Sequence, residues 1–315
     1  MTRNKSSFVL ASALVVLMAC SIAKSKNSGR NPDYLHRQVQ MNSLLRTDAE
    51  KGDDLKRFLS FYNDSAISMP EYQPRLKGKK EIENFYKEIF ERQHVKSFEK
   101  KIVEIITLDS TIVEIGTFTK KYVTPPVDTT IIQDGKYWNI WAINTDGNLI
   151  LEGEAFGFYT PVKDISSLIV RVPGKQANEF RGASSRTVPF ELRAYNALNE
   201  KYVHVRDGAT RSEFYTSDAV IFPFADSTVS GIDKIRPYLT AYTSGGGIIL
   251  DSVAVFTDRY KKLTDGYLEY FGFQVKWRTP GATGRTEGKG IRIWRRQADG
   301  ALKMYREIGT HDHIE

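Results

Sequence analysis

Residues 134–159 read DGKYWNIWAINTDGNLILEGEAFGFY, and residues 287–312 repeat the pattern as EGKGIRIWRRQADGALKMYREIGTHD. A fixed offset (294 − 141 = 153) places Trp141 on Trp294 and Glu154 on Glu307. In each copy, two segments of alternating apolar and polar residues flank an Asp-Gly pair, which is a strong signal for a β-hairpin. The chain therefore contains the same hairpin twice.

Earlier parts of the two halves match at the same offset, with Tyr62 on Tyr215 and Pro70 on Pro223. An offset that is kept through several elements indicates a tandem duplication of one domain of about 125 residues, a common domain size. We expect a first domain at 33–159, a linker at 160–188 and a second domain at 189–315. Each domain is expected to bury a core of its own.

Hydrophobic periodicity predicts the order helix, helix, strand, helix and then four antiparallel strands in each half. In the first half, Leu55, Phe58, Leu59 and Tyr62 have the spacing of a helix face, and a short strand follows at Ala66–Met69. The four later strands are expected at about 98–108, 111–122, 135–144 and 148–158.

The composition is that of a soluble globular protein. Of the 315 residues, 41% are hydrophobic and 26% are charged, and the formal net charge is +7. Lysine pairs are scattered over both halves, which is typical of solvated faces and edge strands rather than of a nucleic-acid site. We therefore expect no nucleic-acid partner.

The first 20 residues resemble a bacterial lipoprotein signal peptide. Arg3 and Lys5 precede an apolar run that is too short to span a bilayer, and the run ends in Leu17-Met18-Ala19-Cys20, a lipobox-like sequence. Cys20 is the only cysteine, so the chain can form no internal disulfide. The resemblance implies a lipid on Cys20, a tether at 21–32, export, and a membrane anchor, with Ser21 favouring the outer membrane.

Both halves resemble the NTF2-like superfamily, which includes SnoaL-like cyclases and ketosteroid isomerases. The matching segments are FYNDSAISMP at 61–70 with Gly78, and FYTSDAVIFP at 214–223 with Gly231. The implied fold class is α+β, with two tandem cone-shaped domains, each a curved antiparallel sheet packed on helices around a pocket. Fold alone does not fix function.

The ketosteroid isomerase mechanism is not expected, because its three functional positions are changed in both copies. The resemblance places its base on Met69 and Phe222, and its second donor on Asn139 and Arg292. Its tyrosine donor falls on leucine in both copies, at positions 45 and 198. Proton transfer of that kind needs a base and donors for the enolate oxygen.

Strand alternation predicts which side chains share one face of the sheet, and the resemblance implies that this face lines the pocket. The candidate ligand-binding residues are Met69, Asn139, Trp141, Glu154, Phe222, Arg292, Trp294, Tyr305 and Glu307. Glu307 and Glu154 are the candidate catalytic groups, since an unpaired glutamate in an apolar pocket has a raised pKa. In the alternative interpretation, Glu307 pairs with Arg292 and Glu154 accepts from Asn139, and both acids are structural.

These patterns favour an exported lipoprotein that binds a small, partly apolar molecule without catalysis. The alternatives are a SnoaL-like cyclase, dehydratase or isomerase that uses a pocket glutamate, and an interaction module in which sheets pair between domains or in a homodimer. His311 and His313 lack the rest of a ligand set, so we expect no metal, and no motif indicates a cofactor.

Overall fold

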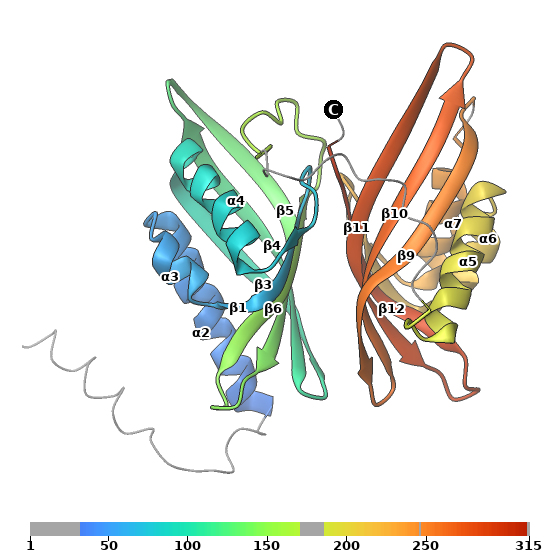
Figure 1. The fold of residues 1–315 in the computed structure, drawn as a ribbon, viewed down its shortest axis with the longest axis horizontal. Coiled ribbons are helices and arrows are strands. Elements are labelled where there is room, and N and C mark those ends of the chain that lie inside the picture. Colours follow the sequence, from blue (N-terminus) through green and yellow to red (C-terminus); the bar gives the residue numbers. More distant parts are fainter. Residues whose placement is uncertain (1–31, 171–185, 246, 314–315) are drawn as a thin grey trace, which may run out of the picture.

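A computed structural model of the chain describes residues 32–170, 186–245 and 247–313 (Figure 1). Cys20, the signal peptide at 1–20, most of the tether at 21–32 and part of the linker at 160–188 lie outside the described residues. No helix in the described ranges is both long enough and apolar enough to cross a membrane.

The two halves repeat one order of elements (Figure 1). The first half contains α2 (Pro32–Lys51), α3 (Leu55–Leu59), β1 (Tyr62–Pro70), β2 (Leu76–Lys77), α4 (Lys79–Arg92), β3 (His94–Leu108), β4 (Thr111–Thr124), β5 (Val127–Ile143) and β6 (Leu149–Phe158). The second half contains α5 (Phe190–His204), α6 (Gly208–Arg211), η2 (Ser212–Phe214), β7 (Tyr215–Phe222), β8 (Val229–Ser230), α7 (Ile232–Thr243), β9 (Ile249–Leu263), β10 (Gly266–Thr279), β11 (Ala282–Arg296) and β12 (Leu302–His311).

Each half forms one six-stranded sheet, in the orders β2-β1-β6-β5-β4-β3 and β8-β7-β12-β11-β10-β9. The α+β class and the two tandem cone-like domains are thus confirmed. The sheets are mixed rather than purely antiparallel, because β1 pairs with β6 and β7 with β12 in parallel. The chain passes through one helix and four strands before β6 is added beside β1, and this long connection permits the parallel pairing.

The Asp-Gly hairpins form as the sequence predicts. Gly147 and Gly300 have φ values of +80° and +84°, a left-handed conformation that glycine adopts without strain. Asn144 Oδ1 accepts from the backbone N–H groups of Asp146 and Asn148 at 3.0 and 2.9 Å and closes the first turn. Sequence and structure differ at the second helix, because α3 ends at Leu59 and Tyr62 already belongs to a strand.

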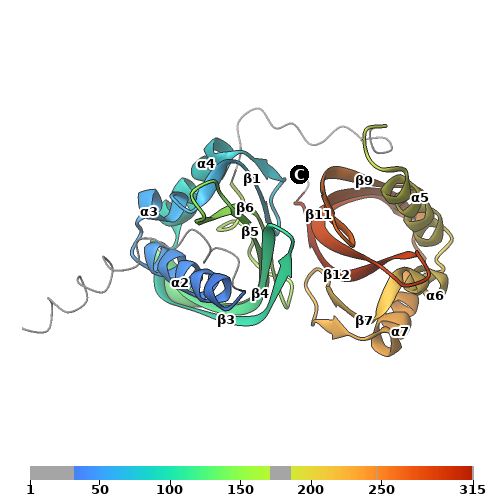
Figure 2. The ribbon, with the colours of Figure 1, turned by 90° about the horizontal axis from the view of Figure 1, so that it is seen from below.

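Each sheet packs its own helices on one side, and those helices lie on the outer flanks of the molecule (Figure 2). Two separate clusters of buried side chains fill these cones, one around Trp141 and one around Trp294. Both tryptophans are fully buried. Each half therefore has the core of its own that the duplication predicts.

A third cluster joins the halves, because the opposite faces of the two sheets pack against each other (Figures 1 and 2). It uses matching positions from both copies: Met69 and Phe222, Trp138 and Ile291, Ile140 and Ile293, and Ala155 and Ile308. The same surface of each copy thus meets its counterpart, as in a twofold-symmetric dimer. Trp138 and Phe222 touch edge to face, with ring centroids 5.6 Å apart.

Polar contacts surround this shared cluster. Arg306 holds Glu104 of the other domain through two hydrogen bonds of 2.9 Å, a bidentate geometry. Lys136 reaches across to the backbone carbonyl of Asp226 at 2.6 Å. The two domains therefore form one continuous packed unit.

Candidate functional site

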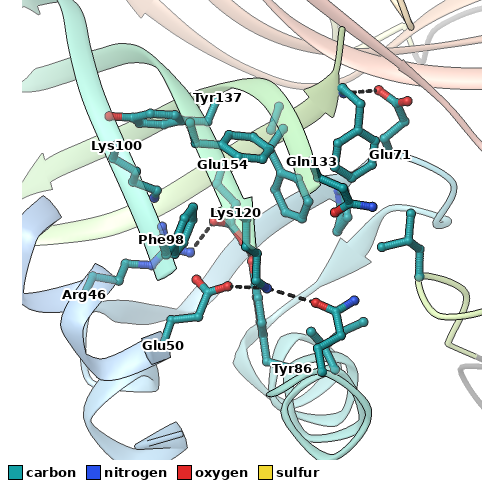
Figure 3. A pocket seen from close by; sticks show the side chains of 18 of the residues that line it. Arg46, Glu50, Glu71, Tyr86, Phe98, Lys100, Lys120, Gln133, Tyr137 and Glu154 are labelled. Carbon is teal, nitrogen blue, oxygen red and sulfur yellow. Dashed lines mark hydrogen bonds and ion pairs between the residues drawn. The ribbon is translucent and has the colours of Figure 1, made fainter. Parts of the chain in front are cut away.

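Each cone encloses a cavity between its helices and the helix-facing side of its sheet. The first cavity, shown in Figure 3, measures about 70 Å³. The second measures about 190 Å³. A cavity needs roughly 10–15 Å³ of this kind of volume to hold one water molecule, so both spaces are large enough for a small ligand.

Glu154 lines the first cavity close to Arg46 (Figure 3), and four donors hold its carboxylate. Arg46 of α2 pairs with its Oε2 at 2.5 Å. Tyr62, Ser68 and Tyr86 donate to its Oε1 at 2.7, 2.6 and 2.9 Å. Burial alone would raise the pKa of Glu154, but the Arg46 guanidinium and the three hydroxyl groups lower it below its usual value.

A second buried acid, Glu114 of β4, lies next to this group. It accepts from Ser43 and Tyr137 through Oε1 at 2.6 and 2.7 Å. Its Oε2 accepts from Asn139 at 3.0 Å and from the Trp141 indole at 2.9 Å. Asn139 therefore donates to Glu114 rather than to Glu154, which corrects the pairing that the sequence suggested.

The second cone places Arg292 and Glu307 in direct contact. Arg292 Nε donates to Glu307 Oε1 at 2.9 Å, and the Tyr215 hydroxyl donates to Oε2. Burial alone would raise the pKa of Glu307. The charges of Arg292 and Arg211, together with the hydrogen bonds from Tyr215 and Arg292, lower this pKa below its usual value. A matching buried acid, Glu269, accepts from the Trp294 indole at 2.7 Å.

The two cones obtain their arginine from different elements. Arg46 and Asn139 in the first domain correspond to Asn199 and Arg292 in the second, at the offset of the duplication. The arginine thus comes from the first helix in one copy and from the penultimate strand in the other, while asparagine occupies the remaining position. In both copies the arginine reaches the glutamate of the last strand, Glu154 or Glu307.

The structure distributes the predicted ligand-binding residues over cavities, cores and the domain interface. Those that line the first cavity are Asn139 and Glu154, and those that line the second are Phe222, Arg292 and Glu307. Trp141 and Trp294 lie in the two domain cores, where their indoles bind buried acids. Met69 and Tyr305 lie in the cluster between the domains.

A β-bulge explains the position of Tyr305. Strict alternation would place it on the same side as Glu307, but the pairing of β11 with β12 passes from Ile293–Arg306 to Trp294–Met304 and leaves Tyr305 as an extra residue. Its hydroxyl consequently reaches Glu104 of the first domain at 3.3 Å. The corresponding bulge in β6 turns Glu152 towards Lys261 of the second domain, at 3.9 Å.

The two cavities differ sharply in charge at matched positions. The strand register gives Lys100 and Val255 equivalent positions, because Lys100 pairs with Phe118 in the next strand and Val255 pairs with the equivalent Phe273. In the same way, Lys120 is equivalent to Val275. The offset of the duplication aligns Glu50 with Val203. All six side chains line their cavities. The first cavity is therefore polar where the second is apolar.

Three important residues were not identified from the sequence. Arg46 and Arg211 lie on short or amphipathic helices, where periodicity shows only the apolar stripe. Glu114 sits among apolar residues of a strand. One signal was available for Glu114. It pairs with Asn139, and Glu269 pairs with Arg292, the equivalent position of the second copy, so both copies carry an acid at the same place.

The described residues contain no group of three or more histidine, cysteine, aspartate or glutamate side chains arranged to hold a metal ion. His311 lines the second cavity and stacks on Phe224, with ring centroids 4.0 Å apart. Burial, and to a smaller extent the charge of Lys289, lower the pKa of His311 to about 4, so the imidazole is neutral at pH 7. It can donate or accept one hydrogen bond in the cavity.

No protein-family model matches the chain, and no curated protein matches it. Among solved structures, a ketosteroid isomerase-like protein from Erwinia carotovora atroseptica SCRI1043 is 13% identical, with a TM-score of 0.38 over 40% of this chain and 96% of that one. An NTF2-like protein from Cytophaga hutchinsonii ATCC 33406 is 12% identical, with a TM-score of 0.34 over 41% and 98%. An NTF2-like superfamily protein from Salmonella enterica serovar Typhimurium is 10% identical, with a TM-score of 0.38 over 43% and 98%. At such low identity, function is inferred only from the residues of the two cavities.

Proposed function

We propose that the second domain binds a small, largely apolar molecule that has a carbonyl or anionic end, without transforming it chemically. The observation that carries this proposal is the cavity of about 190 Å³, whose apolar walls end at a cluster of two arginines and one carboxylate. Ligand sites of this kind are mostly apolar and use a few polar groups to orient the ligand.

The walls of the second cavity are built for an apolar ligand body. Val203, Val255 and Val275 replace three charged residues of the first domain, and Phe271 and Phe273 complete the same side. A ligand that fills this space removes its own apolar surface from water, worth roughly 25 cal/mol per Å².

The inner end of the cavity favours a ligand group with negative charge or a partial negative charge. Arg292 and Arg211 both line it, whereas Glu307 is the one carboxylate among the described lining residues. Arg292 Nη1 is buried and has no hydrogen-bond partner in the described part of the chain, and it lies 3.8 Å from Glu269 Oε2. A carbonyl or carboxylate oxygen offers the acceptor that such donors require.

The same geometry argues against catalysis by the pocket acids. Both oxygens of Glu307 already accept hydrogen bonds, and its pKa is lowered rather than raised. A general base works best with a pKa near the working pH and with a lone pair directed at the substrate. Glu154 is saturated in the same manner by Arg46 and three hydroxyl groups.

Filling the second cavity should remove binding. With 2-naphthoate as the probe, Val255→Phe is expected to weaken binding at least tenfold, because the added ring occupies the space that the ligand needs. Val255 is buried on the cavity wall. Naphthoate fluorescence, titrated with the purified full chain at pH 7, measures the affinity, and the melting temperature reports whether the variant folds.

The matched control is Val127→Phe, which adds the same ring at an exposed valine at the start of β5. It should bind 2-naphthoate as the unaltered chain does. Equal affinity of the Val255→Phe variant and the unaltered chain for 2-naphthoate would overturn the proposed site. If the unaltered chain bound naphthalene as tightly as 2-naphthoate, the proposed recognition of an anionic end would be wrong.

We further propose that the chain is exported and anchored to a membrane by a lipid on Cys20. The support is the sequence Leu17-Met18-Ala19-Cys20 after a short apolar run, together with the absence of any other cysteine from the sequence. Ser21 after the cysteine favours the outer membrane. A diacylglycerol supplies two acyl chains, enough for stable anchoring.

Cys20→Ser should release the protein from membranes while leaving the folded domains unchanged. The unaltered protein is expected to stay with membranes through a high-salt wash, because acyl chains and not charges hold it. Separation of cell membranes from the soluble fraction measures where the protein is, and the intact mass of the protein shows whether Cys20 carries a lipid. Recovery of the unaltered protein in the soluble fraction without added lipid would contradict the proposal.

A further inference from the structure

Three residues of β12 follow one another along the wall of the second cavity. Glu307, Gly309 and His311 all line it, and β12 pairs with β11 without a break from Glu307 to His311. Side chains two positions apart on a strand share a face, and four residues of strand span roughly 13 Å. The carboxylate that pairs with Arg292 and the imidazole of His311 are therefore polar groups at well-separated points of one cavity.

Gly309 leaves the wall between these two groups bare. A Cβ atom on Gly309 would meet no atom within 4 Å beyond its chain neighbours, so open space runs along this part of the strand. Its φ lies outside the left-handed region, so the backbone does not require glycine here. The first domain has Phe156 at the equivalent position (309 − 153 = 156), and that residue lines the first cavity. The second domain thus leaves open a place where the first carries a phenyl ring.

His311 offers a hydrogen bond that its own packing does not use. Phe224 stacks on the imidazole with ring centroids 4.0 Å apart, and Phe273 meets it at an interplanar angle of 69°. Neither ring nitrogen makes a hydrogen bond with any residue in the described ranges. Burial keeps the ring neutral by lowering its pKa to about 4, so one nitrogen can donate and the other can accept.

The first copy shows that this position of the fold accepts a ring without polar atoms. Phe158 is equivalent to His311 (311 − 153 = 158), and it lies in an aromatic cluster with Tyr72, the ring centroids being 6.3 Å apart. A phenyl ring has the same flat faces as an imidazole but no donor or acceptor. Histidine adds only the two ring nitrogens to such packing, and in the second cavity these nitrogens are available to a ligand.

We propose that the second cavity selects an elongated ligand with a polar group at each end: a carbonyl or carboxylate group that Arg292 binds, and a hydroxyl group that His311 binds. The apolar body of the ligand lies between them, across Gly309. A hydroxyl group suits a neutral imidazole because both can donate and accept. This inference rests on the function proposed above for the same cavity, and it adds a second point of recognition and a minimum length.

The test compares two probes that share one fused-ring body, 2-naphthoate and 6-hydroxy-2-naphthoate. In the second probe, the rings hold the hydroxyl group at the end opposite the carboxylate. Isothermal titration calorimetry with the full chain at pH 7 should show that this hydroxyl group tightens binding about fivefold to tenfold, the contribution of one hydrogen bond. The positional isomer 3-hydroxy-2-naphthoate carries its hydroxyl group beside the carboxylate and should show no such gain.

His311→Phe gives the second domain the residue of the first. The ratio of the affinities for 6-hydroxy-2-naphthoate and 2-naphthoate should fall to about one, because the ring stays and only its nitrogens are removed. A residue that merely supported the fold would change both affinities alike and leave the ratio as it was. The matched control is His94→Phe, at an exposed position at the start of β3, which should keep the gain from the 6-hydroxyl group.

Gly309→Phe gives the second cavity the ring that the first domain carries at Phe156. It should weaken the binding of both probes at least tenfold, because the new ring occupies the path between Arg292 and His311. The melting temperature should stay near that of the unaltered chain, since the added side chain enters open space. Equal binding of both probes to this variant and to the unaltered chain would show that no ligand lies across Gly309.

The two proposals for this cavity fail in different ways. Equal affinities of the unaltered chain for 2-naphthoate and its 6-hydroxy derivative would overturn this inference and leave the proposed function standing. A gain that survives in His311→Phe, or that a 3-hydroxyl group gives equally, would also overturn it. A chain that binds neither probe would overturn the proposed function and this inference with it. The comparison of probes needs no variant, so it decides even if His311→Phe does not fold.

Discussion

Replacing Arg46 by asparagine is expected to lower the free energy of unfolding by about 3–5 kcal/mol, since it leaves the buried Glu154 without its cation. The three hydroxyl groups on Glu154 would remain, but they carry no charge to offset that of the carboxylate. Urea unfolding at pH 7, followed by circular dichroism, measures the loss. Arg37→Asn, at an exposed position of the same helix, should change the stability by no more than about 0.5 kcal/mol.

The second copy of the domain predicts how this loss can be reversed. Asn139→Arg, combined with Arg46→Asn, gives the first domain the arrangement of Asn199 and Arg292 in the second. The double variant should recover most of the stability, whereas Asn139→Arg alone should be destabilising, because it places two guanidinium groups together. A double variant that is as unstable as the sum of the single changes would show that the two arrangements are not equivalent.

Trp141→Ala is the second change with a large expected effect, a loss of about 3–5 kcal/mol in the free energy of unfolding. The substitution removes a fully buried ring from the first core and also removes an indole donor from Glu114. Trp294→Ala does the same to the second core and to Glu269. Both variants should remain soluble enough for urea unfolding followed by circular dichroism and by hydrogen exchange.

Sequence reasoning alone predicts that each change affects only its own half, because each half has its own core. The structure leads to a different expectation, since the cluster between the sheets buries residues from both halves. Unfolding of either half would expose that face of the other, so both variants should shift one common transition. Two separate transitions, with Trp141→Ala moving only one of them, would show that the halves unfold independently.

The duplicated hairpins made the fold predictable. Their Asp-Gly turns, their alternation and a constant offset lie in one continuous stretch, so local rules are enough to identify them. The parallel pairing of β1 with β6 was not predictable in the same way, because it joins residues 86 to 89 positions apart in the sequence, such as Pro70 and Phe156 (156 − 70 = 86), and depends on the curvature of the whole sheet.

The cavities were harder to predict for two physical reasons. An extra residue in β6 and β12 reverses the direction of Glu152 and Tyr305, and a bulge leaves no clear mark in an alternating sequence. The arginine of the first cone comes from a helix, so its contact with Glu154 joins residues 108 positions apart. The exchange of arginine and asparagine between the copies is visible in the sequence. Its role is clear only in the structure, where Arg46 pairs with Glu154 and Arg292 pairs with Glu307, the glutamates at equivalent positions of the two last strands.

The cluster between the sheets also has a consequence for dilute solutions. Two separate chains that met through the same faces would dissociate as their concentration fell, and each would then expose an apolar sheet to water. Here the chain continues from one domain into the other, so each face meets its counterpart at an effective concentration on the order of millimolar, whatever the amount of protein present. The two unlike cavities are thereby kept in a fixed ratio of one to one in every molecule.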